Sequence, residues 1–204
     1  MKTSALPQKI NQVHPLIDFL DSVQPLSAGA KKILLRDSSQ MTVEKKRFIL
    51  KPGAASQNFY FIVKGVVQGF VKENGRSITT WIMQENEIAG SFRTVGTGEP
   101  CNEYVQALED SQLIVLPVAT TEYMFDHYPE SNVIARRLWE FKYRQAEERA
   151  YLVRISNATK RYNRFIEIYP GLADRISLKY IASHLGMTLE TLSRIRSRQQ
   201  RAAE

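Results

Sequence analysis

The segment from Ile176 to Arg198 constrains the fold most, because its apolar residues have the spacing of two short helices joined by a turn. Leu178, Ile181 and Leu185 follow the i, i+3, i+7 pattern of an amphipathic helix. Gly186 stands where this helix must end and the chain must reverse, a position that usually requires a positive φ. The pattern therefore predicts a first helix that ends at a glycine turn.

A second helix is expected to run from about Thr188 to Arg198. Thr188 is a suitable N-cap, and Glu190 lies in the first turn, where the helix dipole favours negative charge. Only Leu192 and Ile195 form an apolar seam, and the remaining face is polar and rich in arginine. Such a helix suits the major groove of DNA, so the two helices predict a helix-turn-helix. The alternative is an ordinary helical hairpin with a solvated face.

The net charge of +7 is concentrated in the same part of the chain. Residues 1–135 hold 13 Lys and Arg against 14 Asp and Glu, whereas residues 136–204 hold 15 against 7. The asymmetry indicates that a polyanion is bound by the C-terminal third. A basic but merely solvated helical surface would have the same composition.

The rest of the composition is typical of a globular protein without a membrane partner. The 204 residues, 43% of them hydrophobic, suffice for one large or two small domains. Apolar runs stay well below the roughly 20 residues that span a bilayer, and Met1–Pro7 lacks the apolar core of a signal peptide. One cysteine, Cys101, excludes an internal disulfide and a four-cysteine metal cluster. We therefore expect a cytoplasmic location.

Periodicity divides the chain into helical, β-rich and again helical zones. Residues up to about Glu44 have helical patterns, and from about Lys45 to Pro117 short β-type runs alternate with turns. Asn74–Gly75 is a strong signal for a two-residue hairpin turn. The expected strands are residues 48–50, 59–63, 66–71, 77–83, 103–108 and 112–116. Their spacing of about 8–12 residues indicates a sandwich or barrel.

A long helix is expected after Pro129, because Glu130 to about Ser156 contain neither proline nor glycine. Such a helix would measure roughly 40 Å at 1.5 Å per residue. Since one small β domain cannot cover it, we expect it to pair with its own copy in a homodimer, the alternative being packing along its own β domain. A further helix is expected from about Ala158 to Tyr169. The apolar positions of the long helix are Ile134, Leu138, Phe141, Leu152 and Ile155, with Ala146 and Tyr151 as additions.

This order of elements resembles the cyclic-AMP receptor/fumarate-nitrate reduction regulator (Crp/Fnr) family of bacterial transcription regulators, from about Leu26 to Arg198. The most specific part is Tyr180–Ile195, and Gly65 and Pro52–Gly53 match family turns. The resemblance implies an α+β fold with a cyclic-nucleotide-binding-like β-roll (a double-stranded β-helix), a long dimerisation helix and a winged helix-turn-helix. The expected domains are residues 1–128, 129–156 and 157–204.

The resemblance also implies the function and the DNA-contacting residues. We expect a dimeric, sequence-specific regulator that is not an enzyme, with double-stranded DNA, a second copy and RNA polymerase as partners. Family members read bases with a glutamate and an arginine, which fall on Glu190 and Arg194 here. Leu189 replaces an arginine found in many relatives, so Ser193 is included as a substitute. The residues expected to contact phosphates are Ser177, Lys179, Thr188, Thr191 and Arg198.

Nucleotide-binding members carry a Gly-Glu pair and, about ten residues later, an Arg-Ser or Arg-Thr pair. Gly90–Ser91 and Cys101–Asn102 stand at these positions, so the phosphate-clamping guanidinium is missing. We expect no cyclic-AMP binding and see no evident cofactor. The cavity either binds another small molecule or is filled by side chains. The possible effector pocket comprises Gly90, Ser91, Phe92, Arg93, Cys101 and Asn102, with Arg93 expected to face solvent and Cys101 to be an inert buried thiol.

Two other functions compete with this one. An enzyme or metal protein is disfavoured, because His14, His127 and His184 are isolated from one another and are expected at the surface. The alternative function is a β-roll that binds a small molecule or another protein without any DNA-directed role. The uneven charge and the arginine-rich second helix oppose this alternative.

Overall fold

The computed structural model describes residues 14–95 and 97–203. The described chain separates into two compact units, which we treat one at a time. The first unit holds the residues up to Gly69 together with Ile82–Glu140, and the second holds Phe70–Trp81 together with the chain from Phe141 onward.

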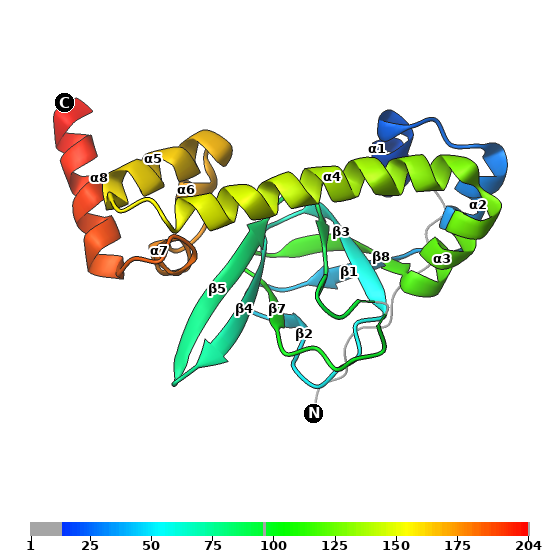
Figure 1. The fold of residues 1–204 in the computed structure, drawn as a ribbon, viewed down its shortest axis with the longest axis horizontal. Coiled ribbons are helices and arrows are strands. Elements are labelled where there is room, and N and C mark those ends of the chain that lie inside the picture. The colour runs from blue at the N-terminus through cyan, green and yellow to red at the C-terminus, as the bar shows by residue number, and fades with distance from the viewer. Residues whose placement is uncertain (1–13, 96, 204) are drawn as a thin grey trace. The chain divides into compact units, whose positions relative to one another are not determined.

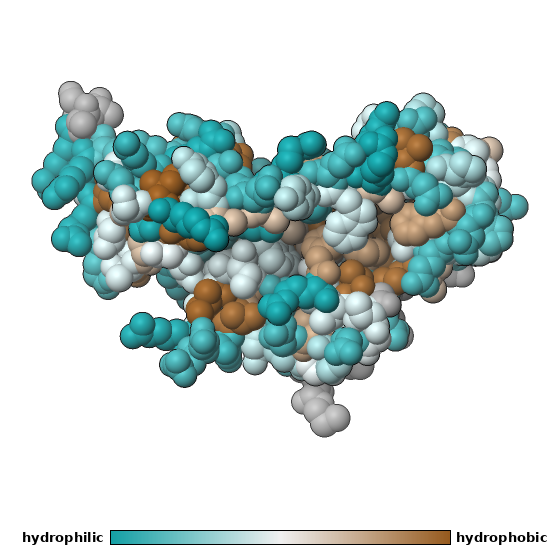
Figure 2. Space-filling view, in the orientation of Figure 1, coloured by the Kyte–Doolittle hydropathy of each residue, from teal (hydrophilic) through white to brown (hydrophobic). Residues whose placement is uncertain are grey.

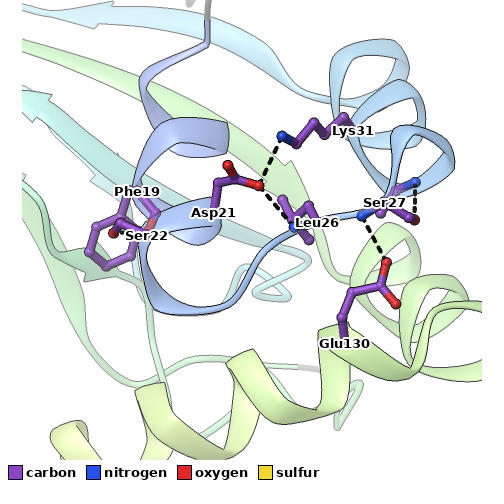
Figure 3. A network of polar contacts seen from close by, with 8 residues as sticks. Phe19, Asp21, Ser22, Leu26, Ser27, Lys31 and Glu130 are labelled. Atoms are coloured by element: carbon purple, nitrogen blue, oxygen red, sulfur yellow. Dashed lines mark hydrogen bonds and ion pairs between the residues drawn. The ribbon is translucent and has the colours of Figure 1, made fainter.

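The first unit begins with two short helices, α1 (Pro15–Val23) and α2 (Ala28–Asp37). The carboxylate of Asp21 accepts a hydrogen bond from the Leu26 amide at 2.8 Å and pairs with Lys31 at 2.9 Å, so it joins the two helices (Figure 3). These contacts, the backbone hydrogen bond first, lower the pKa of Asp21. The Ser27 amide donates to Glu130 at 3.1 Å, which also ties the start of α2 to a later helix.

Two four-stranded sheets form the β-roll (Figure 1). One has the strand order β1-β8-β3-β6 and the other β2-β7-β4-β5. Antiparallel pairing places Tyr60 opposite Val115 and Ser39 opposite Val115 on its other side. The strands are β1 (Ser39–Val43), β2 (Phe48–Leu50), β3 (Asn58–Lys64), β4 (Val67–Glu73), β5 (Arg76–Met83), β6 (Ile88–Ala89), β7 (Tyr104–Ala107) and β8 (Ser111–Pro117).

The prediction of helical structure up to Glu44 was wrong at its end. α2 ends at Asp37, Ser38 is extended, and Ser39–Val43 form β1, which pairs with β8. Five residues carry too short a pattern to separate helix from strand, and the strand forms because β8 offers an unpaired edge. The two-residue β6 and the helix α3 (Val118–His127) were also not predicted.

Two turns of the roll depend on glycine. Gly65 has φ +113°, and an added Cβ would lie 2.2 Å from the Ser111 hydroxyl and 2.8 Å from the Ser111 Cα. The predicted hairpin turn is confirmed, with φ +48° at Asn74 and +75° at Gly75, the two positive values that a type I′ turn requires.

The core of the first unit lies between the sheet that contains β3 and β8 and the helices α1, α2 and α3. Leu138 of the next helix packs against it from one side. Burying these side chains provides the main favourable free energy of the unit. The buried cluster consists of Leu16, Ile17, Leu20, Leu26, Ala30, Ile33, Leu34, Phe61, Ile114, Leu116, Met124 and Ile134.

The long helix α4 runs from Pro129 to Leu152, over 24 residues instead of the predicted 27 (Figure 1). Proline suits the first position, because its missing N–H would have no helical partner there. Beyond Leu152 the chain tightens into i to i−3 hydrogen bonds, from Arg154 to Tyr151 at 3.0 Å and from Ile155 to Leu152 at 3.2 Å. The last predicted turn is therefore not α-helical.

The second unit contains the helices α5 (Ala158–Ile168), α6 (Leu172–Arg175), α7 (Leu178–His184) and α8 (Leu189–Ala203). The Asn157 side chain caps α5 by accepting from the Lys160 amide at 3.0 Å. The buried side chains of the second unit include Tyr162, Phe165, Leu172, Ile181, Leu185 and Leu192.

The predicted wing is not formed by the described residues. A wing needs a β-hairpin beside the two helices, but within 141–203 the structure has helices and turns, and α8 continues to Ala203. A separate result concerns membranes: among the described helices, none has a stretch long and apolar enough to cross a bilayer.

Candidate nucleic-acid interface and effector site

The turn between α7 and α8 is a complete Schellman motif. Gly186 adopts φ +61°, its amide donates to the Ser183 carbonyl at 3.2 Å, and the Met187 amide donates to the Ala182 carbonyl at 3.0 Å. The predicted glycine turn is therefore confirmed. Ala182 is buried, and its small side chain permits the close approach of the second helix.

The start of α8 is stabilised by Thr188, as predicted. Its hydroxyl accepts from the Thr191 amide at 3.2 Å and lies 3.1 Å from the Thr191 hydroxyl. Glu190 follows in the first turn, and hydrogen bonds from its own backbone amide and from Thr188 lower its pKa, with a smaller effect from the charge of Arg194. Glu190 is therefore an anion that can only accept hydrogen bonds at neutral pH.

The two faces of α8 differ sharply in exposure. Leu192 is fully buried and Ile195 is buried beside it, whereas Glu190 and Arg194 are exposed. Leu189 is 45% exposed, which is unusual for leucine and leaves an apolar group on a polar face. Hydrophilic side chains predominate on the side of α8 that the space-filling view shows (Figure 2). Ser193, the remaining residue expected to read bases, is exposed too.

The residues expected to contact phosphates fall on the two helices and their starts. Ser177 is the N-cap residue of α7 and is exposed, as is Lys179 in its first turn. The Lys179 ammonium lies 4.8 Å from the centre of the Tyr180 ring. Thr188 and Arg198 are exposed on α8, while Thr191 is half-buried.

Two polar residues on the inner flank of α8 were not singled out from the sequence. The Arg196 guanidinium donates to the Ala173 carbonyl at 3.2 Å and pairs with Asp174 at 3.1 Å, which fastens α8 to α6. The Gln199 amide donates to Asn163 on α5 at 2.6 Å. The sequence could have indicated these two contacts, because positions four and seven residues after Leu192 lie beside the apolar seam of α8.

Two histidines were wrongly predicted to lie at the surface. His184 packs with its ring centre 6.0 Å from that of Phe165, and burial lowers its pKa to about 4, with a smaller contribution from the charge of Arg149. His14 is also buried, and burial lowers its pKa. Position 184 lies three residues after the buried Ile181 and so on the inward face of α7, but a histidine there was predicted to lie at the surface. His127 is exposed, as predicted.

The residues at the expected nucleotide-clamp positions bond to each other. The Cys101 thiol lies 3.0 Å from the Ser91 hydroxyl and 3.2 Å from the Glu103 carbonyl. The Ser91 hydroxyl also lies 3.1 Å from the Thr94 hydroxyl. Ser91 has no exposed surface, Gly90 is buried, and Cys101 is buried as predicted.

These side chains do not fit a cyclic phosphate. Neither Ser91 nor Cys101 carries positive charge, and both are engaged with neighbouring oxygen atoms. Arg93 and Asn102, the remaining polar residues of the expected pocket, are exposed. Burial of an anion without a paired cation is costly, so the site lacks what a nucleotide phosphate needs.

Phe92 connects this region to α4 within the first unit. Its ring meets that of Trp139 edge-on with centres 5.5 Å apart, and it lies 6.0 Å from the ring centre of Phe59. Such aromatic pairs stabilise a fixed arrangement by about 0.5–1.5 kcal/mol each. The loop after β6 is therefore packed against α4 by a side chain of the chain itself.

Comparison with known proteins agrees with this architecture. Residues 40–128 match the family model of the cyclic nucleotide-binding domain. The fumarate nitrate reduction regulatory protein of Klebsiella oxytoca is 24% identical over 172 residues, which cover 78% of this chain and 68% of that protein. Residues 40–128 are thus similar to a cyclic nucleotide-binding domain, and over most of its length the chain is similar to a fumarate nitrate reduction regulatory protein. By its name, that protein is a regulator.

Solved structures share the fold over most of the chain. FixK2 from Bradyrhizobium japonicum has a TM-score of 0.70 at 20% identity, covering 81% of this chain and 86% of its own. A protein described as a transcriptional regulator of the Crp/Fnr family from Eubacterium rectale has a TM-score of 0.69 at 15% identity, covering 90% and 88%. The predicted α+β class, with a β-roll followed by a helical C-terminal region, is therefore confirmed, except for the wing.

Proposed function

We propose that the chain is a dimeric transcription regulator that binds specific DNA sequences with α8. The exposed face of α8 carries this proposal: a carboxylate and a guanidinium project from a helix whose opposite side is held by Leu192 and Ile195. The +8 charge of residues 136–204 would attract the phosphate backbone. In the proposed division, residues 1–128 form the sensor domain, 129–156 the dimerisation helix and 157–204 the DNA-binding domain.

The chemistry of α8 suits a G·C base pair. Arg194 would donate two hydrogen bonds to O6 and N7 of a guanine, and Glu190 would accept one from N4 of a cytosine. Leu189 offers only apolar contact, which favours the methyl group of a thymine, and Ser193 offers a hydroxyl. Ser177, Lys179, Thr188, Thr191 and Arg198 would bind phosphates and so fix the position of α8 without reading sequence.

The dimer is proposed to form along α4, on a different face from the one expected. Ile134 and Leu152 are buried inside the chain, and Leu152 lines a groove together with Ile168 of α5 and Tyr169, the residue that follows α5. A second stripe remains exposed at positions 139, 143, 146 and 150, which have the spacing of one helix face. It consists of Trp139, Tyr143, Ala146 and Ala150, and the two alanines would allow a second copy of α4 to approach closely.

The regulator is proposed to act without cyclic AMP. The support is the Ser91–Cys101 contact at 3.0 Å, which occupies the positions that would have to hold a phosphate. Phe92 packs between Phe59 and Trp139, so the loop after β6 contacts α4 directly, through a side chain of the protein. RNA polymerase is the further partner that transcription regulation requires.

The test is to select binding sites from random double-stranded DNA with the purified full chain and no added nucleotide. We expect a two-fold symmetric site whose halves lie about 34–36 Å apart and an affinity that falls steeply with salt. Addition of cyclic AMP should leave the affinity unchanged. Binding that is absent at low salt, or insensitive to salt, would refute the proposal.

A further inference from the structure

One hydroxyl group joins the β4–β5 hairpin to the first helix of the proposed DNA-reading pair. Ser183 of α7 accepts a hydrogen bond from the Thr79 amide at 2.9 Å and lies 3.2 Å from the Ser77 carbonyl, to which it donates. All three residues belong to the second unit. A single side chain therefore binds both an amide and a carbonyl of the same strand.

The position of β5 explains why these backbone groups are available. β5 is the outermost strand in the order β2-β7-β4-β5, so one of its sides faces no further strand of that sheet. Backbone groups two residues apart point to the same side of a strand, which places the Ser77 carbonyl and the Thr79 amide together. Thr79 is buried, and a buried amide needs an acceptor. The Ser183 hydroxyl thus takes the place of a neighbouring strand.

The hairpin is also a covalent link between the two units. β4 begins in the first unit at Val67, and β5 returns to it at Ile82, whereas the residues between, 70–81, belong to the second unit. Displacement of these strands in the β-roll would therefore also move Ser77 and Thr79, which are hydrogen-bonded to α7.

We propose that Ser183 is a positioning residue, which couples the β4–β5 hairpin to α7 and keeps α7 and α8 in the orientation that binds DNA. This inference rests on the proposed DNA-binding function. The contact uses α7, while Glu190 and Arg194 on α8 stay exposed, so it leaves the reading face open. Regulation of the β-roll, whatever its source, would then reach α8 through this hydroxyl as well as through α4.

The test compares three variants of the full-length protein. Ser183→Ala removes the hydroxyl and favours the helix, so it should not impair folding of α7. Ser183→Thr keeps a hydroxyl at the same carbon and should preserve the contact. Ser156→Ala, at an exposed serine of the same unit, is the matched control. The two measurements are the hydrogen-exchange rate of the Thr79 amide and the affinity for the selected DNA site.

For Ser183→Ala we expect exchange at Thr79 to rise roughly 3- to 10-fold and DNA affinity to fall by a similar factor, since the Thr79 amide loses its acceptor. The threonine variant and the control should resemble the wild type in both measurements. An unchanged Thr79 rate would refute the contact, and a faster rate with unchanged affinity would refute the positioning role. Failure of the wild type to bind DNA would instead refute the proposed function, and the exchange rate would still report on the contact.

Discussion

Arg194 and Arg196 are two positions apart on α8, yet their surroundings give them opposite roles. Arg194 is exposed on the polar face, whereas Arg196 is held by Ala173 and Asp174 and is only 26% exposed. The two residues have the same charge and the same side chain, so composition alone does not distinguish them. Their difference follows from the 100° turn per residue, which puts position 196 on the flank that meets α6.

Replacement of each arginine by alanine should separate binding from stability. Arg194→Ala should weaken binding to the selected site by about 1–3 kcal/mol and relax one base preference, with no change in the free energy of unfolding. Arg196→Ala should lower the free energy of unfolding by about 1 kcal/mol. Binding titrations and urea unfolding of both variants measure the two effects. Equal effects of the two variants on DNA specificity would contradict the assignment.

Gly65 is the residue where the backbone tolerates least change. Gly65→Ala should cost at least about 2 kcal/mol of stability, because φ is +113° and the new Cβ would meet the Ser111 backbone. Gly53→Ala is the matched control: φ is +87° but nothing lies within 4 Å, so only about 1 kcal/mol of backbone strain is expected. Thermal unfolding of both variants compares them, and a Gly65→Ala cost no larger than that of Gly53→Ala would contradict this reading.

At the scale of elements, α7 and α8 form one packed structure with α5 and α6. The pair α7–α8 is joined by the Schellman turn, α8 is fastened to α6 by Arg196 and to α5 by Gln199, and α7 packs His184 against Phe165. The thin apolar seam of α8 is therefore supplemented by polar contacts at its edges. This arrangement leaves the outer face of α8 available.

Packing of His184 should make this group of helices sensitive to acid. Its pKa is about 4 in the folded chain and about 6.5 when unfolded, so between these values the unfolded state binds more protons and stability falls as pH falls. From pH 7.5 to 5 the loss due to His184 should be about 2 kcal/mol. His184→Leu should show a correspondingly smaller loss in urea unfolding followed by circular dichroism. An identical pH dependence in both proteins would refute this account.

At the scale of the whole molecule, α4 is the element that the two units share, with Pro129–Glu140 in the first and Phe141 onward in the second. Its inward positions are used within the chain, and Trp139 and Tyr143 remain 50% and 64% exposed. These two exposed aromatic residues lie on the helix stripe that is proposed to contact a second copy.

Two matched substitutions on α4 test the dimer. Tyr143→Glu should convert the dimer to monomers in light scattering coupled to gel filtration, because it places a charge in the proposed interface. Tyr151→Glu makes the same change on another face of the helix, where the tyrosine is 61% exposed, and should leave the dimer intact. A dimer that survives Tyr143→Glu would contradict the proposed face, as would one lost equally in both variants.

Local patterns in the sequence were sufficient for the elements whose signals are short-range. The glycine turn at Gly186, the Thr188 cap, the Asn74–Gly75 hairpin and the approximate strand positions needed only a few consecutive residues. β1, β6, α3 and the end of α4 were missed, and β1 forms because it pairs with β8, a strand far away in the chain.

The amino-acid sequence alone therefore determined the succession of helical, β-rich and helical zones, the basic C-terminal third and the absence of an arginine at the expected phosphate-clamp positions, since these depend on residue type and spacing. The tertiary structure decided which side chains face inward: His184, Ile134 and Leu152 are buried within the chain. It also placed Ser91 in contact with Cys101, and it directed Arg196 toward Ala173 while Arg194 stays exposed. It also revealed the contact of Ser183 with β5. These are pairings between segments far apart in the chain, and no local pattern specifies them.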